Sequence, residues 1–352
     1  VWIMAYTDID KPSDYFNTKL YTGTGSSNAV TGVGFEPSFT WIKNRGGTNF
    51  HNLYDVIRGA TKTLDSATTA AESTSGSGLT AWGSDGFTVV SDGDVNASSN
   101  PYVSWNWVAG TSFTNDASAT GIGSIDSTGS FNNDSGFSIV SYTGTGSAGT
   151  IKHGLNSAPS MIIVKKRNTT NNWDCFHASL GATKHIYLNA TNAVMDNVNR
   201  WNDTAPTTSV FSVGDGGSVN ASSDTYIAYC FAEKKGYSKF GKYIANANAN
   251  GTFVYLGFKP AFLLIKNTSQ ETDWIMYDNK RDGYEPQNKE FATNSSAVEA
   301  NAEDNNVQFC ANGFKSRNTG TKTNADSGNT LIYMCFAEQP LVTSTGVPAT
   351  AR

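Results

Sequence analysis

The sequence predicts an all-β protein of three tandem antiparallel sandwich-like repeat domains with little helix. Gly, Asn, Ser and Thr are turn residues, and in these 352 residues they separate short β-branched and aromatic runs. Whole segments recur at a nearly constant offset, and strand-like segments alternate with period two. Two Ala- and Thr-containing stretches, 58–72 and 289–301, are the best candidates for a helix.

Internal repeats set the domain organisation. The duplicated segments are Val-Asn-Ala-Ser-Ser at 95–99 and 219–223, Gly-Ala-Thr-Lys at 59–62 and 181–184, and Tyr-Thr-Gly-Thr-Gly at 21–25 and 142–146. The offsets of 124, 122 and 121 place the two copies in register. A weaker third copy shares Cys-Phe-Ala-Glu, at 230–233 and 335–338, and a Pro six residues before a Lys, at Pro37 and Lys43, Pro159 and Lys165, and Pro260 and Lys266.

Units of about 100 to 120 residues are large enough to be domains with their own cores. The expected division is a lead-in at 1–12, β-repeats at 13–112, 113–236 and 237–345, and a tail at 346–352. The second repeat opens with a Gly/Ser/Asn-rich linker, 110–136, which can also contribute an edge strand. We expect the three sandwiches to lie in a row.

The last strand of each unit carries the strongest period-two pattern. Trp105, Tyr229 and Met334 stand at equivalent places on its apolar face. Because side chains alternate faces along a strand, each of these residues should be buried in the core of its own unit.

Composition excludes several function classes. The net charge is −5 and the pI is about 5.4, which argues against a nucleic-acid-binding surface of clustered Lys and Arg. No apolar run approaches the roughly 18 residues of a spanning helix, so no membrane insertion is expected.

The chemistry-bearing residues form no recognisable constellation. Gly144 to Gly149 match the dinucleotide fingerprint, but no βαβ pattern surrounds them, so a Gly-rich β-turn is favoured. No two of the four His have metal-ligand spacing. We interpret them as surface residues or as strand residues whose ring nitrogens have hydrogen-bond partners. Asp92 and Asp94 are too few carboxylates for a convincing cation loop. We therefore expect no catalytic residues, no cofactor and no metal.

The four Cys, at 175, 230, 310 and 335, include no CxxC pair. They are predicted to be free thiols, mostly buried as small hydrophobes, with no disulfide. This fits assembly in a reducing cytoplasm.

Two tryptophans stand apart from the strand patterns. Trp82 and Trp201 lie in polar loops, where a ring could stack on a sugar or anchor a partner. Loop tryptophans more commonly fold back to cap the end of a sandwich. These two residues are the candidate ligand-contact aromatics.

The repeated phrases resemble a β-rich domain family of tailed-bacteriophage structural proteins, notably from phages of marine and cyanobacterial hosts. They include Gly-Phe-Glu-Pro-Ser-Phe-Thr-Trp-Ile-Lys at 34–43, Tyr-Ile-Ala-Tyr-Cys-Phe-Ala-Glu at 226–233 and Gly-Tyr-Ser-Lys-Phe-Gly at 236–241. Those proteins are usually labelled tail-fibre-like, and the resemblance covers about 14–340. It implies a virion component that is assembled in the host cytoplasm and exposed outside the particle. It transfers no catalytic or binding residue.

The resulting expectation is a non-enzymatic tail fibre or adhesin that contacts the host cell surface. Its partners would be other virion proteins, a host surface glycan or protein, and copies of itself in a homotrimer. The alternatives are a capsid decoration or head-fibre protein, and a polysaccharide-degrading tailspike or carbohydrate-binding module.

Overall fold

The structure is a computed structural model that describes residues 6–349, and it confirms the all-β prediction. Both helix candidates are wrong. The first stretch contains β5 (Lys62–Asp65), and the second contains β24 (Lys289–Ala292) and β25 (Ala300–Asn301). β5 and β24 each pair antiparallel with the strand before them, so sheet pairing overrides a weak helical propensity.

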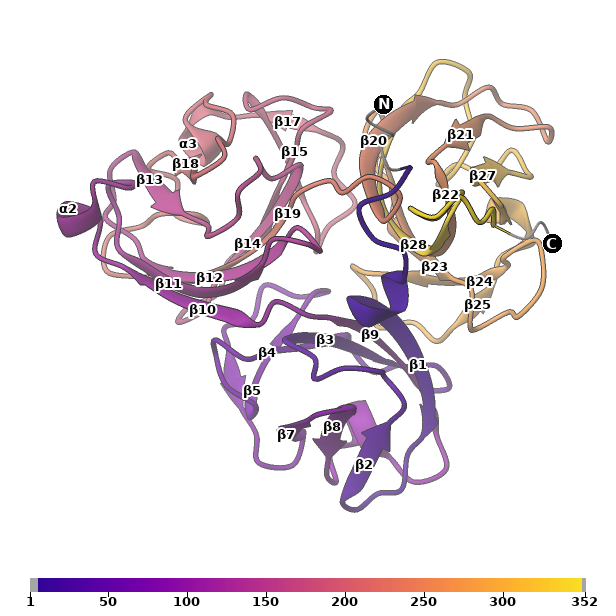
Figure 1. The fold of residues 1–352 in the computed structure, drawn as a ribbon, viewed down its shortest axis with the longest axis horizontal. Coiled ribbons are helices and arrows are strands. Elements are labelled where there is room, and N and C mark those ends of the chain that lie inside the picture. Colours follow the sequence, from indigo (N-terminus) through magenta and orange to yellow (C-terminus); the bar gives the residue numbers. More distant parts are fainter. Residues whose placement is uncertain (1–5, 350–352) are drawn as a thin grey trace.

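Each of three units combines a large sheet with a small one (Figure 1). The first unit comprises β1 (Phe16–Thr22), β2 (Asn28–Thr31), β3 (Phe39–Asn44), β4 (Asn52–Asp55), β5, β6 (Ser73–Thr74), β7 (Leu79–Gly83), β8 (Gly86–Val89), α1 (Gly93–Asn96) and β9 (Pro101–Trp107). The second comprises β10 (Thr111–Asn115), α2 (Ala117–Thr120), β11 (Ser127–Asn132), β12 (Phe137–Thr143), β13 (Gly149–Lys152), β14 (Met161–Lys166), β15 (Trp173–His177), β16 (Lys184–Tyr187), β17 (Met195–Asp196), α3 (Val198–Trp201), β18 (Val210–Val213) and β19 (Thr225–Phe231). The third comprises β20 (Ser238–Ile244), β21 (Phe253–Tyr255), β22 (Phe258–Asn267), β23 (Trp274–Asp278), β24, β25, β26 (Val307–Cys310), β27 (Gly313–Ser316) and β28 (Thr330–Pro340).

The strand order is the same in all three large sheets. It runs β1-β9-β3-β4-β5-β6 in the first unit and β20-β28-β22-β23-β24-β25 in the third. The second unit repeats this order from β12 to β17 and adds β10 and β11 outside β12. The Gly/Ser/Asn-rich segment is therefore a pair of edge strands, and its first strand begins at Thr111, two residues before the expected boundary.

The expectation of a row is wrong: the units surround a common centre (Figure 1). One apolar cluster contains residues of all three, including Trp105, Tyr229 and Met334. These residues are buried, as predicted, but in the shared centre rather than in separate cores. Each unit also has a core of its own on the opposite face of its large sheet.

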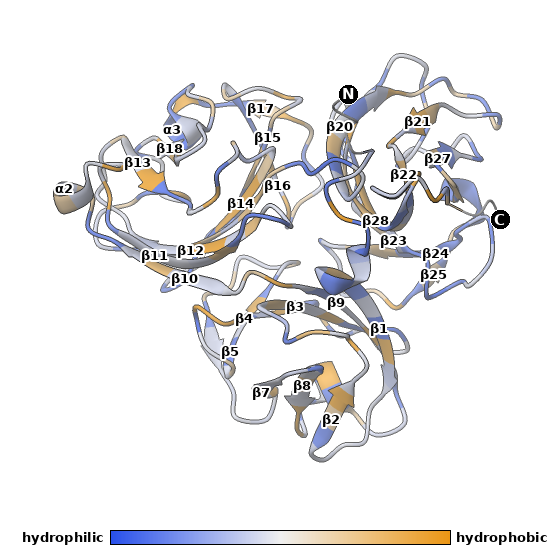
Figure 2. Cartoon of the chain, viewed as in Figure 1, coloured by the Kyte–Doolittle hydropathy of each residue, from blue (hydrophilic) through white to orange (hydrophobic). Residues whose placement is uncertain are grey.

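The shared centre explains the apolar character of both faces of the last strands. A strand that is buried on both faces reads as a nearly continuous hydrophobic run. In the third unit, Ile332 and Met334 face the shared cluster while Tyr333 and Cys335 face the unit's own core. Figure 2 shows the hydrophobic residues concentrated on the strands.

The interfaces between neighbouring units follow one plan. The three lysines of the Pro-to-Lys pattern are fully buried, and each donates to a backbone carbonyl of another unit. The pairs are Lys43 with Ser296 at 3.2 Å, Lys165 with Thr69 at 3.0 Å and Lys266 with Thr191 at 3.0 Å. Burial lowers the pKa of each lysine to about 8. The motif is therefore an interface motif.

Two of the three interfaces add a bidentate ion pair. Arg45 contacts Glu299 with both distances at 2.8 Å, and Arg167 contacts Glu72 at 2.9 and 3.1 Å. In both interfaces the backbone N–H of the glutamate also donates to the carbonyl of the arginine. At the equivalent place in the second–third interface, Val194 N donates to Thr268 O. That interface lacks the ion pair because neither residue is charged.

The lead-in contributes to the centre. Ile9 is buried in the shared cluster, and Thr7 donates its hydroxyl to the carbonyl of Lys235 at 3.1 Å. Before β1 the chain forms the 3-10 turn η1 (Pro12–Asp14). The N-terminal segment thus lies against the junction between the second and third units.

Candidate functional site

The most strongly repeated motifs contact each other. In the first unit, Asn96 Oδ1 accepts from Thr24 N at 3.0 Å and its Nδ2 donates to Ser26 O at 2.6 Å. We call this pair of hydrogen bonds the asparagine clamp. In the second unit Asn220 accepts from Thr145 N and donates to Ser147 O. In the third unit Asn324 accepts from Asn246 N and donates to Asn248 O. All three asparagines are fully buried. These motifs therefore build turns, because buried amide groups need hydrogen-bond partners.

The segment that matches the dinucleotide fingerprint is the turn clamped by Asn220. Gly146 has a φ of +74°, a conformation that glycine adopts readily. The segment runs from β12 into β13, which pairs antiparallel with β18, so no βαβ unit follows. The structure supports the β-turn interpretation.

The histidines are satisfied interior residues. His51 Nε2 donates to Ala292 O at 3.1 Å, while its Nδ1 accepts from Trp41 Nε1 at 2.8 Å. His177 Nε2 likewise donates to Tyr333 O at 3.1 Å. Burial lowers the pKa of His177 to about 4 and that of His51 well below its usual value. Both rings lie in interfaces between units and stay neutral near pH 7.

The two tryptophans nominated from the sequence are not brought together. Trp201 belongs to α3, is only 1% exposed and packs edge-on against Phe176. A ring so enclosed cannot stack on a ligand, so Trp201 is corrected to a core residue. Trp82 belongs to β7 and is half-buried against the core of the first unit. Neither residue lines the cavity at the start of the third unit that is described below.

Asp92 caps α1 and accepts from Asp94 N at 3.0 Å, which is a structural role. Among residues 6–349, no group of three or more His, Cys, Asp or Glu could hold a metal ion. Within the same residues, no helix is long and apolar enough to span a bilayer.

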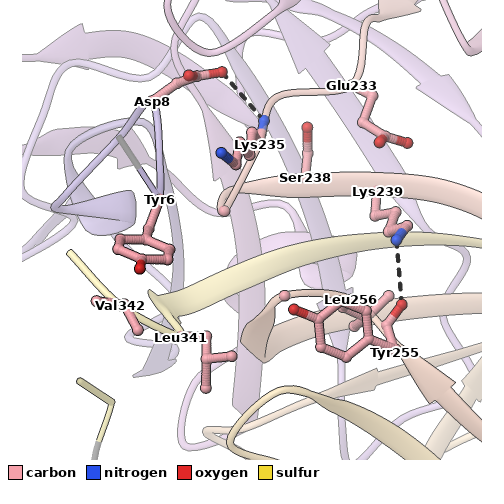
Figure 3. A pocket seen from close by; sticks show the side chains of 12 residues that line it. Tyr6, Asp8, Glu233, Lys235, Ser238, Lys239, Tyr255, Leu256, Leu341 and Val342 are labelled. Atoms are coloured by element: carbon pink, nitrogen blue, oxygen red, sulfur yellow. Dashed lines mark hydrogen bonds between the residues drawn. The ribbon is translucent and has the colours of Figure 1, made fainter. Parts of the chain in front are cut away.

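The feature that does resemble a ligand site belongs to the third unit and its surroundings (Figure 3). It is a cavity of about 510 Å³, within the usual range of small-molecule sites. Tyr6 from the lead-in and Tyr255 from β21 lie along it and are 62% and 54% exposed. Asp8, Glu233, Lys235 and Lys239 supply its charged groups. We call it the tyrosine pocket.

Hydrogen bonds hold this pocket in shape. Asp8 and Lys235 exchange two contacts, from Asp8 N to Lys235 O at 3.0 Å and from Lys235 N to the Asp8 carboxylate at 3.3 Å. Lys239 Nζ donates to Tyr255 O at 3.2 Å and lies 5.6 Å from the centre of the ring. At Gly236 a Cβ would meet Thr7 Oγ1 at 2.3 Å, so only glycine permits this approach.

The arrangement suits a polar molecule with a flat apolar face. An exposed tyrosine offers a ring for stacking and a hydroxyl for hydrogen bonding. Two carboxylates and two ammonium groups, from the charged residues named above, line the walls in equal number. The pocket can therefore bind and orient a neutral, hydroxyl-rich ligand.

Sequence reasoning missed this pocket because Tyr255 looks like an ordinary strand residue. The signal that identifies it is its departure from the repeat. Register places Val30, Ile151 and Val254 at equivalent positions, and the residues that follow them are Thr31, Lys152 and Tyr255. The other lining residues come from segments far apart in the chain, which no local pattern connects.

Comparison with known proteins places the chain in a family. Residues 11–340 match the model of a family described as Domain of unknown function (DUF7483). No curated protein and no solved structure matched the chain. The matched region includes all three units, whereas Tyr6, Asp8, Leu341 and Val342 of the tyrosine pocket lie outside it. Because the match covers most of its length, the chain belongs to the DUF7483 family.

Proposed function

We propose that this protein is a non-enzymatic virion structural protein of a tailed bacteriophage, a tail fibre or adhesin that contacts the host cell surface. The observation that carries the proposal is a division between the units. The motifs that recur in all three units build turns and interfaces, whereas the exposed tyrosine pocket lies where the lead-in and the end of the second unit meet the third unit. Scaffold and recognition surface are thus separate.

The physical character of the surface supports this proposal. Charged residues are 16% of the chain, below the usual quarter. Low charge density limits repulsion between identical subunits and between the protein and an envelope. The proposed partners are other virion proteins and a host surface glycan or protein, and the proposed location is the outside of the particle.

The proposed homotrimer would assemble three such chains, each already containing three units. Several weak sites on one particle gain avidity of about 10²–10⁴. Sedimentation of the purified protein at micromolar concentration tests the proposed homotrimer. A trimer supports the proposal, and a stable monomer contradicts it.

Adsorption competition tests the function. Excess purified protein should block attachment of the phage to its host, and Tyr255→Ala should weaken the block. Phe50→Ala is the matched control, because it removes an exposed aromatic ring from the first unit, outside the tyrosine pocket. Undiminished attachment in the presence of excess protein would refute the adhesin proposal.

A capsid decoration protein is the second candidate, and the arrangement of three similar units about one centre favours it. Such a body could sit on a threefold position of a shell. Labelling intact particles with an antibody to this protein separates the two candidates, because label on the head supports decoration and label on the tail supports the adhesin.

A further inference from the structure

The third unit carries a second cavity next to the tyrosine pocket. It measures about 470 Å³, and its lining includes Lys259, Tyr284, Glu285 and Phe309. Tyr284 is 65% exposed and is the most exposed large hydrophobic residue of the described chain. We call this cavity the loop pocket, because Tyr284 and Glu285 belong to the connection between β23 and β24.

That connection is a peculiarity of the third unit. The equivalent connections in the first two units, 56–61 and 178–183, have six residues each. In the third unit the connection covers 279–288, ten residues, and includes Tyr284. The extra length therefore coincides with an exposed aromatic ring that the other units do not have in this loop.

The longer loop is fixed in place rather than loose. The Glu285 carboxylate accepts from Phe309 N at 2.9 Å and from Gln287 Nε2 at 3.0 Å. Gln287 N also donates to Val307 O at 2.7 Å. These bonds tie the loop to β26, so the backbone next to Tyr284 is already ordered, which lowers the entropic cost of binding at this ring.

One turn connects the linings of the two pockets. Cys310, at the end of β26, and Ala311, in the turn between β26 and β27, line the loop pocket, whereas Leu256 and Gly257 line the tyrosine pocket. Asn312, in the same turn, accepts at its carbonyl from Leu256 N at 2.9 Å and from Gly257 N at 3.2 Å. The turn therefore lies between the linings of the two pockets.

The charges along this path balance. Asp8, Glu233 and Glu285 supply three carboxylates, and Lys235, Lys239 and Lys259 supply three ammonium groups, of which that of Lys259 is already paired with Glu338 at 3.0 Å. A polyanion would require an excess of positive charge. The balance instead fits an uncharged polymer that is rich in hydroxyl groups.

We propose that the tyrosine pocket and the loop pocket are subsites of one extended site for a neutral glycan chain, with sugar rings stacked on Tyr255 and Tyr284. This rests on the proposed function and specifies its ligand. An aromatic contact of about 0.5–1.5 kcal/mol corresponds to a change in affinity of roughly 2- to 12-fold.

The test is direct binding to a printed array of neutral and anionic bacterial surface polysaccharides, followed by a length series cut from the strongest neutral binder. Long oligosaccharides should lose affinity in Tyr255→Ala and in Tyr284→Ala, and more in the double variant. The shortest oligosaccharides that still bind should respond to only one of the two substitutions. Phe50→Ala should bind as the wild type does, and thermal unfolding checks that each variant is folded.

Three outcomes would overturn the inference: binding of no neutral glycan, preference for anionic polymers, or affinity for the long chains that neither tyrosine affects. The adsorption competition is independent of this array. If the protein blocks attachment but binds no neutral glycan, the adhesin proposal stands and the ligand is wrong. If it binds the glycan but attachment is untouched, the site stands and the adhesin proposal fails.

Discussion

Trp105 of the first unit donates its indole N–H to the Asp278 carboxylate of the third, at 3.1 Å, in the middle of the molecule. Tyr229 of the second unit makes the matching contact with Asp55 of the first, at 2.8 Å. The last strand of the first unit, β9, is thus hydrogen-bonded to the end of β23 in the third unit. The last strand of the second unit, β19, is hydrogen-bonded to the end of β4 in the first unit. The shared centre therefore combines apolar burial with directed hydrogen bonds between units.

Trp105→Ala should lower the free energy of unfolding of the whole protein by about 3–5 kcal/mol. The reason is that the ring fills a core to which all three units contribute. Denaturant unfolding followed by fluorescence and by circular dichroism should give one coincident transition. Separate transitions for the units would contradict the shared core. Trp82→Ala, at a half-buried position of the first unit alone, is the milder control.

Acid should weaken the interfaces between pH 6.5 and 4. The folded protein keeps His177 neutral, with a pKa of about 4, whereas the unfolded chain binds a proton near pH 6.5. The unfolded state therefore binds more protons in this window, so the stabilising contribution is complete above pH 6.5 and is lost as the pH falls. His177→Gln should flatten the decline in the free energy of unfolding, measured by urea titration at several pH values. An unchanged slope would remove His177 as its cause.

Removing the clamp in the second unit should loosen one turn. Asn220→Ala leaves Thr145 N, Ser147 O and Gly214 O without their partner. The expected cost is about 1–3 kcal/mol. Hydrogen exchange should accelerate at 144–148 more than at the equivalent turn 23–27, which Asn96 holds independently. Asn156→Ala, at an exposed position, should leave both turns unchanged.

Thiol labelling should separate Cys310 from the other cysteines. All four are free in the structure; Cys175, Cys230 and Cys335 are buried, while Cys310 is partly exposed. Burial raises the pKa of every one of these thiols, which lowers its reactivity. The native protein should label slowly at Cys310 alone, and the denatured, unreduced protein should label four times. A denatured count of two or zero would establish disulfides.

The sequence was sufficient to predict the strands, the repeats and the burial of Trp105, because period-two patterns and duplicated motifs are local signals. It did not predict that the units meet at one centre, since alternation identifies a buried face without identifying what covers it. Lys165 was identified only as part of the Pro-to-Lys repeat, and no local signal showed that it is buried against another unit. Trp201 folds back into the core, which is the commoner arrangement for a loop tryptophan; it was nominated as a ligand contact because a polar neighbourhood in the chain says little about the packing of α3.

The closing interface joins the first and third units, which are not consecutive in the chain, through Arg45 and Glu299. The two surfaces can form this contact whether they belong to one chain or to two different chains. If the third unit detaches, the vacated surface can accept the third unit of a neighbouring molecule with the same contacts. Domain swapping would then link molecules at high concentration without any new complementary surface.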